Sequence, residues 1–219
     1  MDIINYVMKD LAIFGAGGFG RELACIIKSI NQKNPTWNLI GYFDDGKEIG
    51  EQTQYGVCLG GVERLNEWNT PLSVVMALGA PKVLRTVVGK IHNPNIDFPN
   101  IIAPNVVLLD ASSLVMGKGN VIFPNSLISC NVKMGDFNML NVYTQMGHES
   151  VLGSYNVIMP TSNISGGVVV GDANLFGVKS VVLQYKKVEN EVVLSPGSVL
   201  SRTAKEGKIY LGNPAKLFM

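Results

Sequence analysis

Charged residues are scarce in this sequence. Lysine, arginine, aspartate and glutamate make up only 16% of the 219 residues, and the formal net charge is +1. Proteins that bind nucleic acid or an anionic membrane carry basic patches, and this chain has no excess of basic residues to form one. The composition therefore argues against nucleic acid and membrane partners and favours a small molecule.

Cysteine and histidine are also rare. The chain has three cysteines, Cys25, Cys58 and Cys130, which lack the close spacing of a zinc site, and their odd number argues against a disulfide scaffold. It has only two histidines, His92 and His148, whereas a β-helical carbonic anhydrase needs three for its zinc ion. We therefore expect reduced thiols and no metal ion.

Long apolar segments are absent as well. No run approaches the ~20 residues that span a bilayer, and the N-terminal segment MDIINYVMKD lacks a basic leader. The sequence thus predicts a soluble, cytoplasmic protein. Its 219 residues have room for one large domain or two small ones, and either would have room for a hydrophobic core.

A six-residue repeat runs through residues 116–200. Every sixth residue is apolar, the following one is mostly small or turn-prone, and the one two before is mostly Asn, Ser or Thr. A short strand and a tight turn every six residues build a triangular coil, and stacked coils bury the apolar column as one core. This predicts a parallel β-helix, which is left-handed in hexapeptide proteins. The column comprises Met116, Ile122, Ile128, Met134, Leu140, Met146, Leu152, Ile158, Ile164, Val170, Phe176, Val182, Val188, Leu194 and Leu200.

Residues 1–97 predict a Rossmann-like α/β domain. An apolar run at residues 11–14 precedes the motif GAGGFG at residues 15–20, and a helical pattern follows. Glycines permit a tight turn and the close approach of a phosphate, while the helix N-terminus offers free N–H groups to an anion. Taken alone the motif is a weak signal, because the same glycines also suit a tight turn that binds nothing.

Two more strands of this domain are expected to end near the same site. Residues 39–43 lead to Asp44 and Asp45, whose carboxylates are placed to accept hydrogen bonds from ribose or sugar hydroxyls, and residues 72–78 lead to Gly79. A full dinucleotide fold needs two such halves, and about 100 residues hold little more than one. A mononucleotide that carries another group fits this space better than NAD.

The second domain is predicted to span residues 98–219, including a C-terminal tail. The segment FPNIIAPNVVLL, residues 98–109, leads into the repeat with its apolar positions out of phase. This predicts irregular first coils and a slip of register at residues 110–114. No linker rich in Gly and Ser separates the domains, so we expect them to pack rigidly together.

One outward-facing column of the solenoid is entirely apolar. In a strand, the residue before an inward-facing one points outward. Soluble proteins rarely leave a contiguous apolar patch in water. We therefore expect this face to form a subunit interface, or to line an apolar ligand cleft beside one. The column comprises Val121, Met139, Val157, Leu175 and Val193.

His148 and Glu149 stand at a predicted coil corner, where side chains face outward. An imidazole exchanges a proton near neutral pH, so it can take the proton of an attacking amine or hydroxyl. Glu149 can orient the ring only at a corner, because neighbours on a straight strand point apart. A surface histidine beside an unrelated glutamate explains these two residues equally well. His92 lies in a polar loop and is given no role.

Several segments together resemble one family, and they cover nearly the whole chain. They are IFGAGGFGRE, YFDD, MALGAP, FPNIIAPNV, NVYTQMGHESVLG and YLGNPAK. The chain is similar to bacterial sugar acyltransferases that join a small Rossmann-like domain to a left-handed β-helix, the group of sialic acid O-acetyltransferases and nucleotide-amino-sugar N-acetyltransferases. The resemblance implies an acetyl-CoA-dependent acetyltransferase of glycan or polysaccharide biosynthesis, and a homotrimer with active sites between adjacent prisms.

The resemblance also implies roles for individual residues. His148 matches the general base, Glu149 the residue that tunes it, and Asn141 a polar residue near the acceptor. Positions that hold the nucleotide sugar are matched by Gly17, Gly18, Phe19, Asp44, Asp45 and Gly79. Positions that border acetyl-CoA are matched by Val157, Gly166, Val178 and Pro196.

The chain departs from the N-acetyltransferases of this group at two positions. They have a histidine in place of Phe19 and an acidic residue in place of Gly147, so Phe19 removes a polar contact to the nucleotide. Our hypothesis is transfer of an acetyl group to the amine of a nucleotide-linked deoxy-amino sugar, with backbone N–H groups near Gly166 holding the oxyanion. Transfer to a sugar hydroxyl stays open. So do an NAD- or nucleotide-binding scaffold without transferase activity and a purely structural solenoid.

Overall fold

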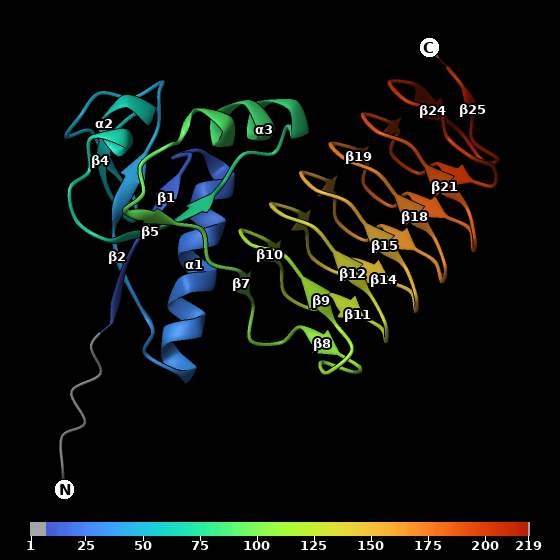
Figure 1. The fold of residues 1–219 in the computed structure, drawn as a ribbon, viewed down its shortest axis with the longest axis horizontal. Coiled ribbons are helices and arrows are strands. Elements are labelled where there is room, and N and C mark those ends of the chain that lie inside the picture. The colour runs from blue at the N-terminus through green and yellow to red at the C-terminus, as the bar shows by residue number, and fades with distance from the viewer. Residues whose placement is uncertain (1–7, 219) are drawn as a thin grey trace, which may run out of the picture.

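The computed structural model describes residues 8–218, which form an N-terminal α/β part and a solenoid that extends away from it (Figure 1). None of the helices described there is long and apolar enough to cross a bilayer. The elements of the first part are β1 (Lys9–Phe14), α1 (Gly18–Lys33), β2 (Trp37–Phe43), β3 (Gln52–Thr53), β4 (Gly56–Gly60), α2 (Val62–Asn66), β5 (Leu72–Met76), α3 (Pro81–Lys90) and β6 (Ile96–Asp97).

The N-terminal sheet has the strand order β3-β4-β2-β1-β5-β6, and only β3 pairs antiparallel. Alternate residues of β1 face opposite sides: Ile13 packs in a cluster with α1, and Phe14 in a cluster with α2 and α3. After β1 the chain adds β2 and β4 on one side of that strand. It then returns to add β5 and β6 on the other side. Such a reversal opens a crevice at the carboxyl ends of β1 and β5. The predicted Rossmann-like arrangement is confirmed, while β3, β4 and α2 were not expected.

The solenoid has three faces, each a parallel sheet of short strands one coil apart. The first face contains β7 (Ile101–Ile102), β10 (Val121–Ile122), β13 (Met139–Leu140), β16 (Val157–Ile158), β19 (Leu175–Phe176), β22 (Val193–Leu194), β24 (Ile209–Leu211) and the antiparallel β25 (Lys216–Leu217). The second face contains β8 (Val107–Leu108), β11 (Leu127–Ile128), β14 (Gln145–Met146), β17 (Asn163–Ile164), β20 (Val181–Val182) and β23 (Val199–Leu200). The third face contains β9 (Val115–Met116), β12 (Lys133–Met134), β15 (Val151–Leu152), β18 (Val169–Val170) and β21 (Lys187–Val188).

This architecture is a left-handed parallel β-helix, as the repeat predicted. Strand partners are eighteen residues apart, for example Met139 with Val157, so three six-residue repeats make one coil. The inward column from Ile122 to Leu200 forms one core cluster. The expected slip of register is also present. Between Leu108 and Met116 the chain makes an enlarged corner, in which Asp110 Oδ1 accepts the backbone N–H of Ser112 at 3.1 Å.

The prism has three edges, which we call the groove corner, the His148 corner and the α3 corner. The groove corner lies between the first and second faces and includes residues 123–126, 141–144, 159–162, 177–180 and 195–198. The His148 corner lies between the second and third faces and includes residues 129–132, 147–150, 165–168 and 183–186. The α3 corner lies between the third and first faces and includes residues 135–138, 153–156, 171–174 and 189–192.

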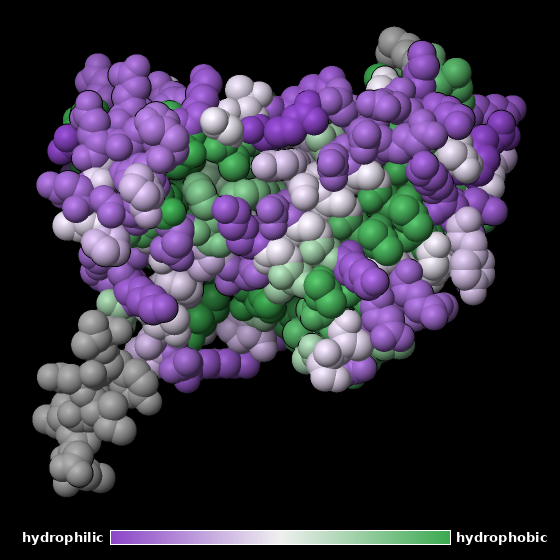
Figure 2. All heavy atoms as spheres, in the orientation of Figure 1, coloured by the Kyte–Doolittle hydropathy of each residue, from purple (hydrophilic) through white to green (hydrophobic). Residues whose placement is uncertain are grey.

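The apolar outward column on the first face is covered by the N-terminal part of the same chain. Val121, Met139 and Val157 are 2%, 5% and 0% exposed and share a cluster with Leu23 and Ile27 of α1. The prediction of a subunit interface is therefore wrong for these three residues, because α1 occupies that place. The alternative expectation was an apolar ligand cleft beside a subunit interface. Met139 lines the groove described below, and a ligand or a second subunit at this groove stays a prediction. Hydrophobic residues are visible at the junction and on the viewed side of the solenoid (Figure 2).

Candidate active site

The corner turn brings the side chains of His148 and Glu149 together. Glu149 adopts the left-handed backbone conformation, with a φ of 57°, which turns its side chain to the same side as that of its neighbour. His148 Nδ1 lies 3.3 Å from Glu149 Oε2, and the two side chains are 50% and 63% exposed. The pairing predicted for this corner is thus present, at a position that a ligand can reach.

His148 lies between two neighbouring coils. Its carbonyl oxygen accepts the N–H of Gly167 at 2.8 Å, and the N–H of Glu149 donates to Cys130 at 3.0 Å. The imidazole rests on Gly166. A Cβ atom on Gly166 would lie 2.5 Å from Nε2 and 2.7 Å from Cε1 of the ring. The absence of a side chain at residue 166 is therefore what leaves room for the imidazole.

The packing around Gly147 accounts for one of the two departures noted in the sequence. A Cβ atom on Gly147 would collide with the backbone nitrogen of Gly166 and lie 2.6 Å from the carbonyl carbon of Ser165. An acidic side chain at residue 147 therefore requires a shift of these coils. In this chain, glycine also leaves the N–H of Gly166 uncovered by a side chain from the coil below.

A groove of about 720 Å³ lies between α1 and the groove corner. It is mostly apolar and opens at the carboxyl ends of β1 and β5, where the strand order predicts a crevice. Four of the predicted substrate-binding residues meet here, namely Gly18, Phe19, Gly79 and Asn141. The remaining lining residues are Glu22, Cys25, Ile26, Phe123, Pro124, Met139, Val142, Met159 and Pro160.

The glycine motif forms the end of the groove at the start of α1. Gly15 has a φ of 108° and Gly20 packs against the carbonyl of Gly15, so both positions require glycine. Gly17 is the N-cap of α1 and supplies no capping side chain, and it has open space where a Cβ would lie. The first N–H groups of the helix therefore face a site that an anion can enter.

Phe19 has an apolar partner in the groove, which accounts for the other departure. Its ring stacks on Phe123 of the groove corner, with centroids 5.4 Å apart and an interplanar angle of 27°. The aromatic pair joins α1 to the solenoid. A histidine at residue 19 would place a polar group in this contact, so the phenylalanine suits the apolar wall.

The carboxylates of Asp44 and Asp45 bind the chain's own backbone. Asp44 Oδ2 accepts the N–H of Ala16 at 2.8 Å, and Asp45 Oδ1 accepts the N–H of Val62 at 2.7 Å. The two residues line a separate hollow of about 480 Å³ together with Lys47, Arg64, Lys90 and others. The structure therefore does not bring them to the groove, and their predicted contact with a sugar nucleotide stays a prediction.

The four residues expected to border acetyl-CoA lie in different places. The side chain of Val157 is 0% exposed in the single chain, so only its backbone is placed to border a ligand, and its predicted role stays a prediction. Gly166 lies under His148. Val178 and Pro196 are exposed at the groove corner, where the N–H of Gly197 donates to Val178 at 2.8 Å.

His148 and the groove lie on different edges of the prism. No residue of the His148 corner lines the groove, which takes its solenoid residues from the first face and the groove corner. One chain therefore does not bring the imidazole and the groove together within residues 8–218. Asn141 belongs to the groove side, where its Oδ1 accepts the N–H of Val142 at 2.7 Å.

Sequence reasoning missed the solenoid wall of the groove. Phe123 and Met159 were not singled out, nor was Cys25 on α1. A signal for part of this wall exists: Pro124, Val142 and Pro160 follow one another at eighteen-residue steps, in the same column as Val178 and Pro196. His92, the other histidine, is exposed, and its ring nitrogen Nδ1 lies 3.1 Å from the carbonyl oxygen of Lys90. Across the described residues, no group of His, Cys, Asp and Glu side chains is placed to hold a metal ion.

Comparisons with known proteins agree with the fold described above. The PglD N-terminal domain family matches residues 10–91. The acetyltransferase domain of PglB from Neisseria gonorrhoeae is 21% identical, with a TM-score of 0.87 over 96% of this chain and 100% of that one. WeeI from Acinetobacter baumannii, at 21% identity, has a TM-score of 0.85 over 96% and 100%. A variant of perosamine N-acetyltransferase from Caulobacter crescentus, in complex with CoA and GDP-perosamine, has a TM-score of 0.82 at 21% identity over 96% and 97%.

No curated protein sequence matches the chain significantly. The resemblance stated from the sequence is nevertheless confirmed. The N-terminal part matches the family named above, and nearly the whole chain shares the fold of proteins described as acetyltransferases. A structure of the Neisseria gonorrhoeae domain contains acetyl coenzyme A.

Proposed function

We propose that this protein transfers the acetyl group of acetyl-CoA to the amino group of a nucleotide-linked deoxy-amino sugar. The observation that carries the proposal is the exposed His148–Glu149 pair, whose imidazole rests on Gly166. A histidine oriented by a carboxylate at a surface that a ligand can reach is the arrangement of a general base. The acetyl-CoA and GDP-perosamine complexes of proteins with the same fold support the choice of the two substrates.

Acetyl transfer to an amine needs one group that accepts the amine proton and later donates it to the CoA thiolate. With its proton on Nδ1, the ring of His148 donates to Glu149 Oε2 and leaves Nε2 free to accept. The amine nitrogen attacks the thioester carbonyl, a C–N bond forms, and Nε2 takes the amine proton. The C–S bond then breaks, and the imidazolium returns the proton to the CoA thiolate. Proton transfer by a positioned histidine contributes about 10²–10⁴-fold to such a rate.

The backbone beside the imidazole can stabilise the negative charge that develops on the carbonyl oxygen. The N–H of Gly167 is occupied by the carbonyl of His148. The N–H of Gly166 has no backbone acceptor within residues 8–218, and Gly147 leaves it unshielded. We assign it to the oxyanion. A single such donor is worth roughly 10²–10³ in kcat in enzymes where it has been removed.

The groove is proposed to hold the nucleotide sugar. Phosphate groups fit the uncapped start of α1 beside Gly17 and Gly18, because its free N–H groups favour an anion. Gly79 leaves open space beyond the carboxyl end of β5, and the stacked rings of Phe19 and Phe123 offer an apolar wall. The groove volume of about 720 Å³ suits a ligand of this size.

A second copy of the chain is proposed to complete the site. In one chain the groove corner and the His148 corner are separated by the second face. This face and its edges expose apolar residues that a neighbouring prism would cover. They are Val107 at 47%, Tyr143 at 56%, Leu183 at 40% and Tyr185 at 72% exposed. Packing of two prisms along this face in a homotrimer would set His148 of one copy beside the groove of the next, with Val178 and Pro196 lining the space between them.

An assay of CoA release with different acceptors distinguishes transfer to a sugar nitrogen from transfer to a sugar oxygen. We expect CoA release from acetyl-CoA with nucleotide-linked amino sugars and none with the matched hydroxy sugars. The opposite result would make the protein a sugar O-acetyltransferase, since the same base serves either nucleophile. A scaffold that only binds a dinucleotide would show no CoA release, and NAD but not acetyl-CoA would raise its melting temperature.

A further inference from the structure

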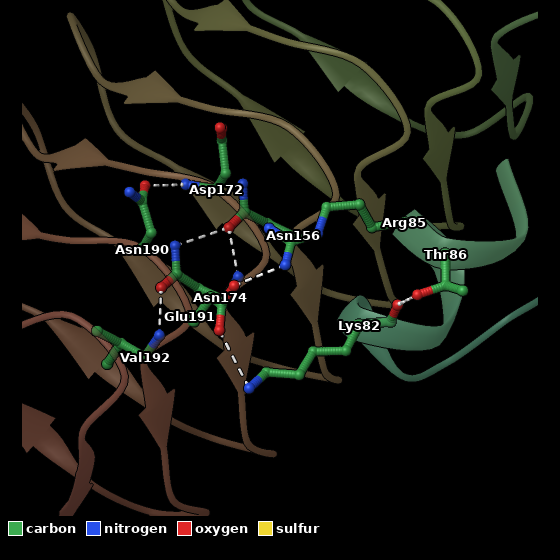
Figure 3. A network of polar contacts seen from close by, with 9 residues as sticks. All are labelled: Lys82, Arg85, Thr86, Asn156, Asp172, Asn174, Asn190, Glu191 and Val192. Atoms are coloured by element: carbon green, nitrogen blue, oxygen red, sulfur yellow. Dashed lines mark hydrogen bonds and ion pairs between the residues drawn. The ribbon is translucent and has the colours of Figure 1, made fainter. Parts of the chain in front are cut away.

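Glu191 of the solenoid forms ion pairs with two basic residues of α3. Its Oε1 lies 2.6 Å from Arg85 Nη2, and its Oε2 lies 3.1 Å from Lys82 Nζ. The two cations are three residues apart and therefore lie on one side of the helix. Leu84 and Val87 are buried in the N-terminal core on the other side. Figure 3 shows Lys82 reaching from α3 toward the α3 corner, where Glu191 lies.

The backbone that carries Glu191 is held in place by a ladder of asparagines. Asn138, Asn156 and Asn174 each donate through Nδ2 to Oδ1 of the preceding asparagine, at 3.0, 3.0 and 2.9 Å. Asn174 Oδ1 in turn accepts the N–H of Val192 at 2.7 Å, one residue beyond Glu191 (Figure 3). All three amides are buried, so the ladder is rigid and fixes the carboxylate relative to the coils.

The ion pairs attach α3 to the solenoid at a point remote in sequence from the covalent joint, in addition to the packing of α1 on the first face. The joint lies at residues 98–100, where Phe98 packs against Phe137 with ring centroids 5.0 Å apart. Arg85 and Glu191 are 106 residues apart in sequence. The helix that carries Lys82 and Arg85 begins at Pro81, immediately after the segment that contains Gly79, a lining residue of the groove.

We propose that Glu191, with Lys82 and Arg85, forms a latch that sets the width of the groove. Without it, α3 and the segment that contains Gly79 are held on the solenoid by apolar contacts, which have little directional preference. The three residues are positioning residues, because none of them lines the groove. The effect on a nucleotide sugar rests on the proposed function, whereas the latch itself does not.

The opposite charges of Glu191 and the two basic residues favour their pairing. Hydrogen bonds from Arg85 and then Lys82 hold the pKa of Glu191 below its ordinary value, so the carboxylate is ionised at neutral pH. Glu191 is 26% exposed, while Lys82 and Arg85 are 70% and 45% exposed. Exposed ion pairs are individually weak, so we expect an effect of about three- to tenfold rather than loss of the fold.

Glu189 supplies a matched control. It is also 26% exposed and pairs with Lys205 at 3.2 Å, within the solenoid rather than across to α3. The test compares Glu191→Gln with Glu189→Gln by hydrogen–deuterium exchange of residues 78–90. A charge-reversed protein, with Glu191→Lys, Lys82→Glu and Arg85→Glu together, tests whether the pairing itself matters.

The latch predicts that Glu191→Gln speeds exchange of residues 78–90 about three- to tenfold, that Glu189→Gln does not, and that charge reversal restores slow exchange. In ~1 M salt the exchange rate of the wild type should approach that of Glu191→Gln, because the Debye screening length falls to about 3 Å. With UDP-, GDP- or dTDP-linked amino sugar as acceptor, KM should rise while kcat stays within about twofold.

Unchanged exchange in Glu191→Gln would overturn the latch, because the apolar contacts would then suffice. So would equal acceleration in Glu189→Gln, which would indicate a general loosening of the solenoid. If the wild type releases no CoA with any acceptor, the proposed function fails, and the exchange comparison still decides the latch.

Discussion

The imidazole of His148 lies on the α-carbon of Gly166, one coil away, so closely that a Cβ atom there would come within 2.5 Å of Nε2. Real Cβ atoms essentially never approach that closely, and Gly166 does not adopt a left-handed conformation that excludes alanine. Gly166→Ala should therefore fold and displace the ring. We expect kcat to fall by about 10²–10³-fold, as measured by CoA release, because the base loses its position.

Gly89→Ala is the matched control for that substitution. Gly89 lies in α3 with open space at its Cβ position. Alanine there should leave turnover unchanged and stabilise the helix by up to about 1 kcal/mol. Full turnover in Gly166→Ala, in a protein whose melting temperature is also unchanged, would contradict the importance of the ring position.

Cys25 offers a chemical probe of the groove. It is exposed and lines the groove, whereas Cys58 is buried. In a Cys130→Ser background, iodoacetamide should modify Cys25 first. A nucleotide that fills the groove should slow this reaction, by about tenfold when the ligand is at ten times its Kd. Alkylation followed by mass spectrometry, with UDP, GDP and dTDP in turn, would measure the protection. Equal rates with all three nucleotides and without any would place the ligand elsewhere.

In the part of the chain that the structure describes, Tyr42 has a buried hydroxyl without a hydrogen-bond partner. Its side chain is 0% exposed, and within residues 8–218 its hydroxyl oxygen has no hydrogen-bond partner. Burial raises the pKa of this phenol, with the neighbouring Cys25 and Tyr55 adding to the effect. Tyr42→Phe removes the unpaired group and keeps the ring, so the free energy of unfolding should rise by about 1 kcal/mol. Denaturant titration would check it, and destabilisation would show that the hydroxyl is hydrogen-bonded after all.

Subunit mixing tests whether two copies build one site. His148→Ala lacks the base, and Gly79→Trp should block the groove without backbone strain, since Gly79 has open space and an ordinary φ. Each variant alone should be inactive. If the groove and the imidazole come from different copies, co-expressed mixed oligomers should recover activity in about one quarter of their sites, by random assembly. Mixtures as inactive as their components would instead place the whole site within one chain.

The repeat made the solenoid predictable, because each inward residue from Ile122 onward must be apolar to share one core. The corner position of His148 and Glu149 followed from the same six-residue step. The glycine motif predicted the turn before α1, since Gly15 requires a positive φ and Gly20 a close contact with the preceding loop.

The sequence could not predict the features that depend on how the N-terminal α/β part packs on the solenoid. The pattern of Val121 and Met139 says only that something apolar covers them, and it does not distinguish α1 from another subunit. The groove wall at Phe123 was missed for the same reason. Asp44 shows a different limit, because its place after a strand gave no sign that the backbone N–H of Ala16 would donate to one of its carboxylate oxygens.

The comparison of His148→Ala with His92→Ala tests the central claim most directly. The chain has only these two histidines, and His92 lies in the N-terminal part, outside the groove lining. With acetyl-CoA and a nucleotide-linked amino sugar, His148→Ala should lose about 10²–10⁴-fold in kcat, while His92→Ala keeps the wild-type value. Turnover by His148→Ala close to that of the wild type would show that another group takes the proton, and the proposed mechanism would be wrong.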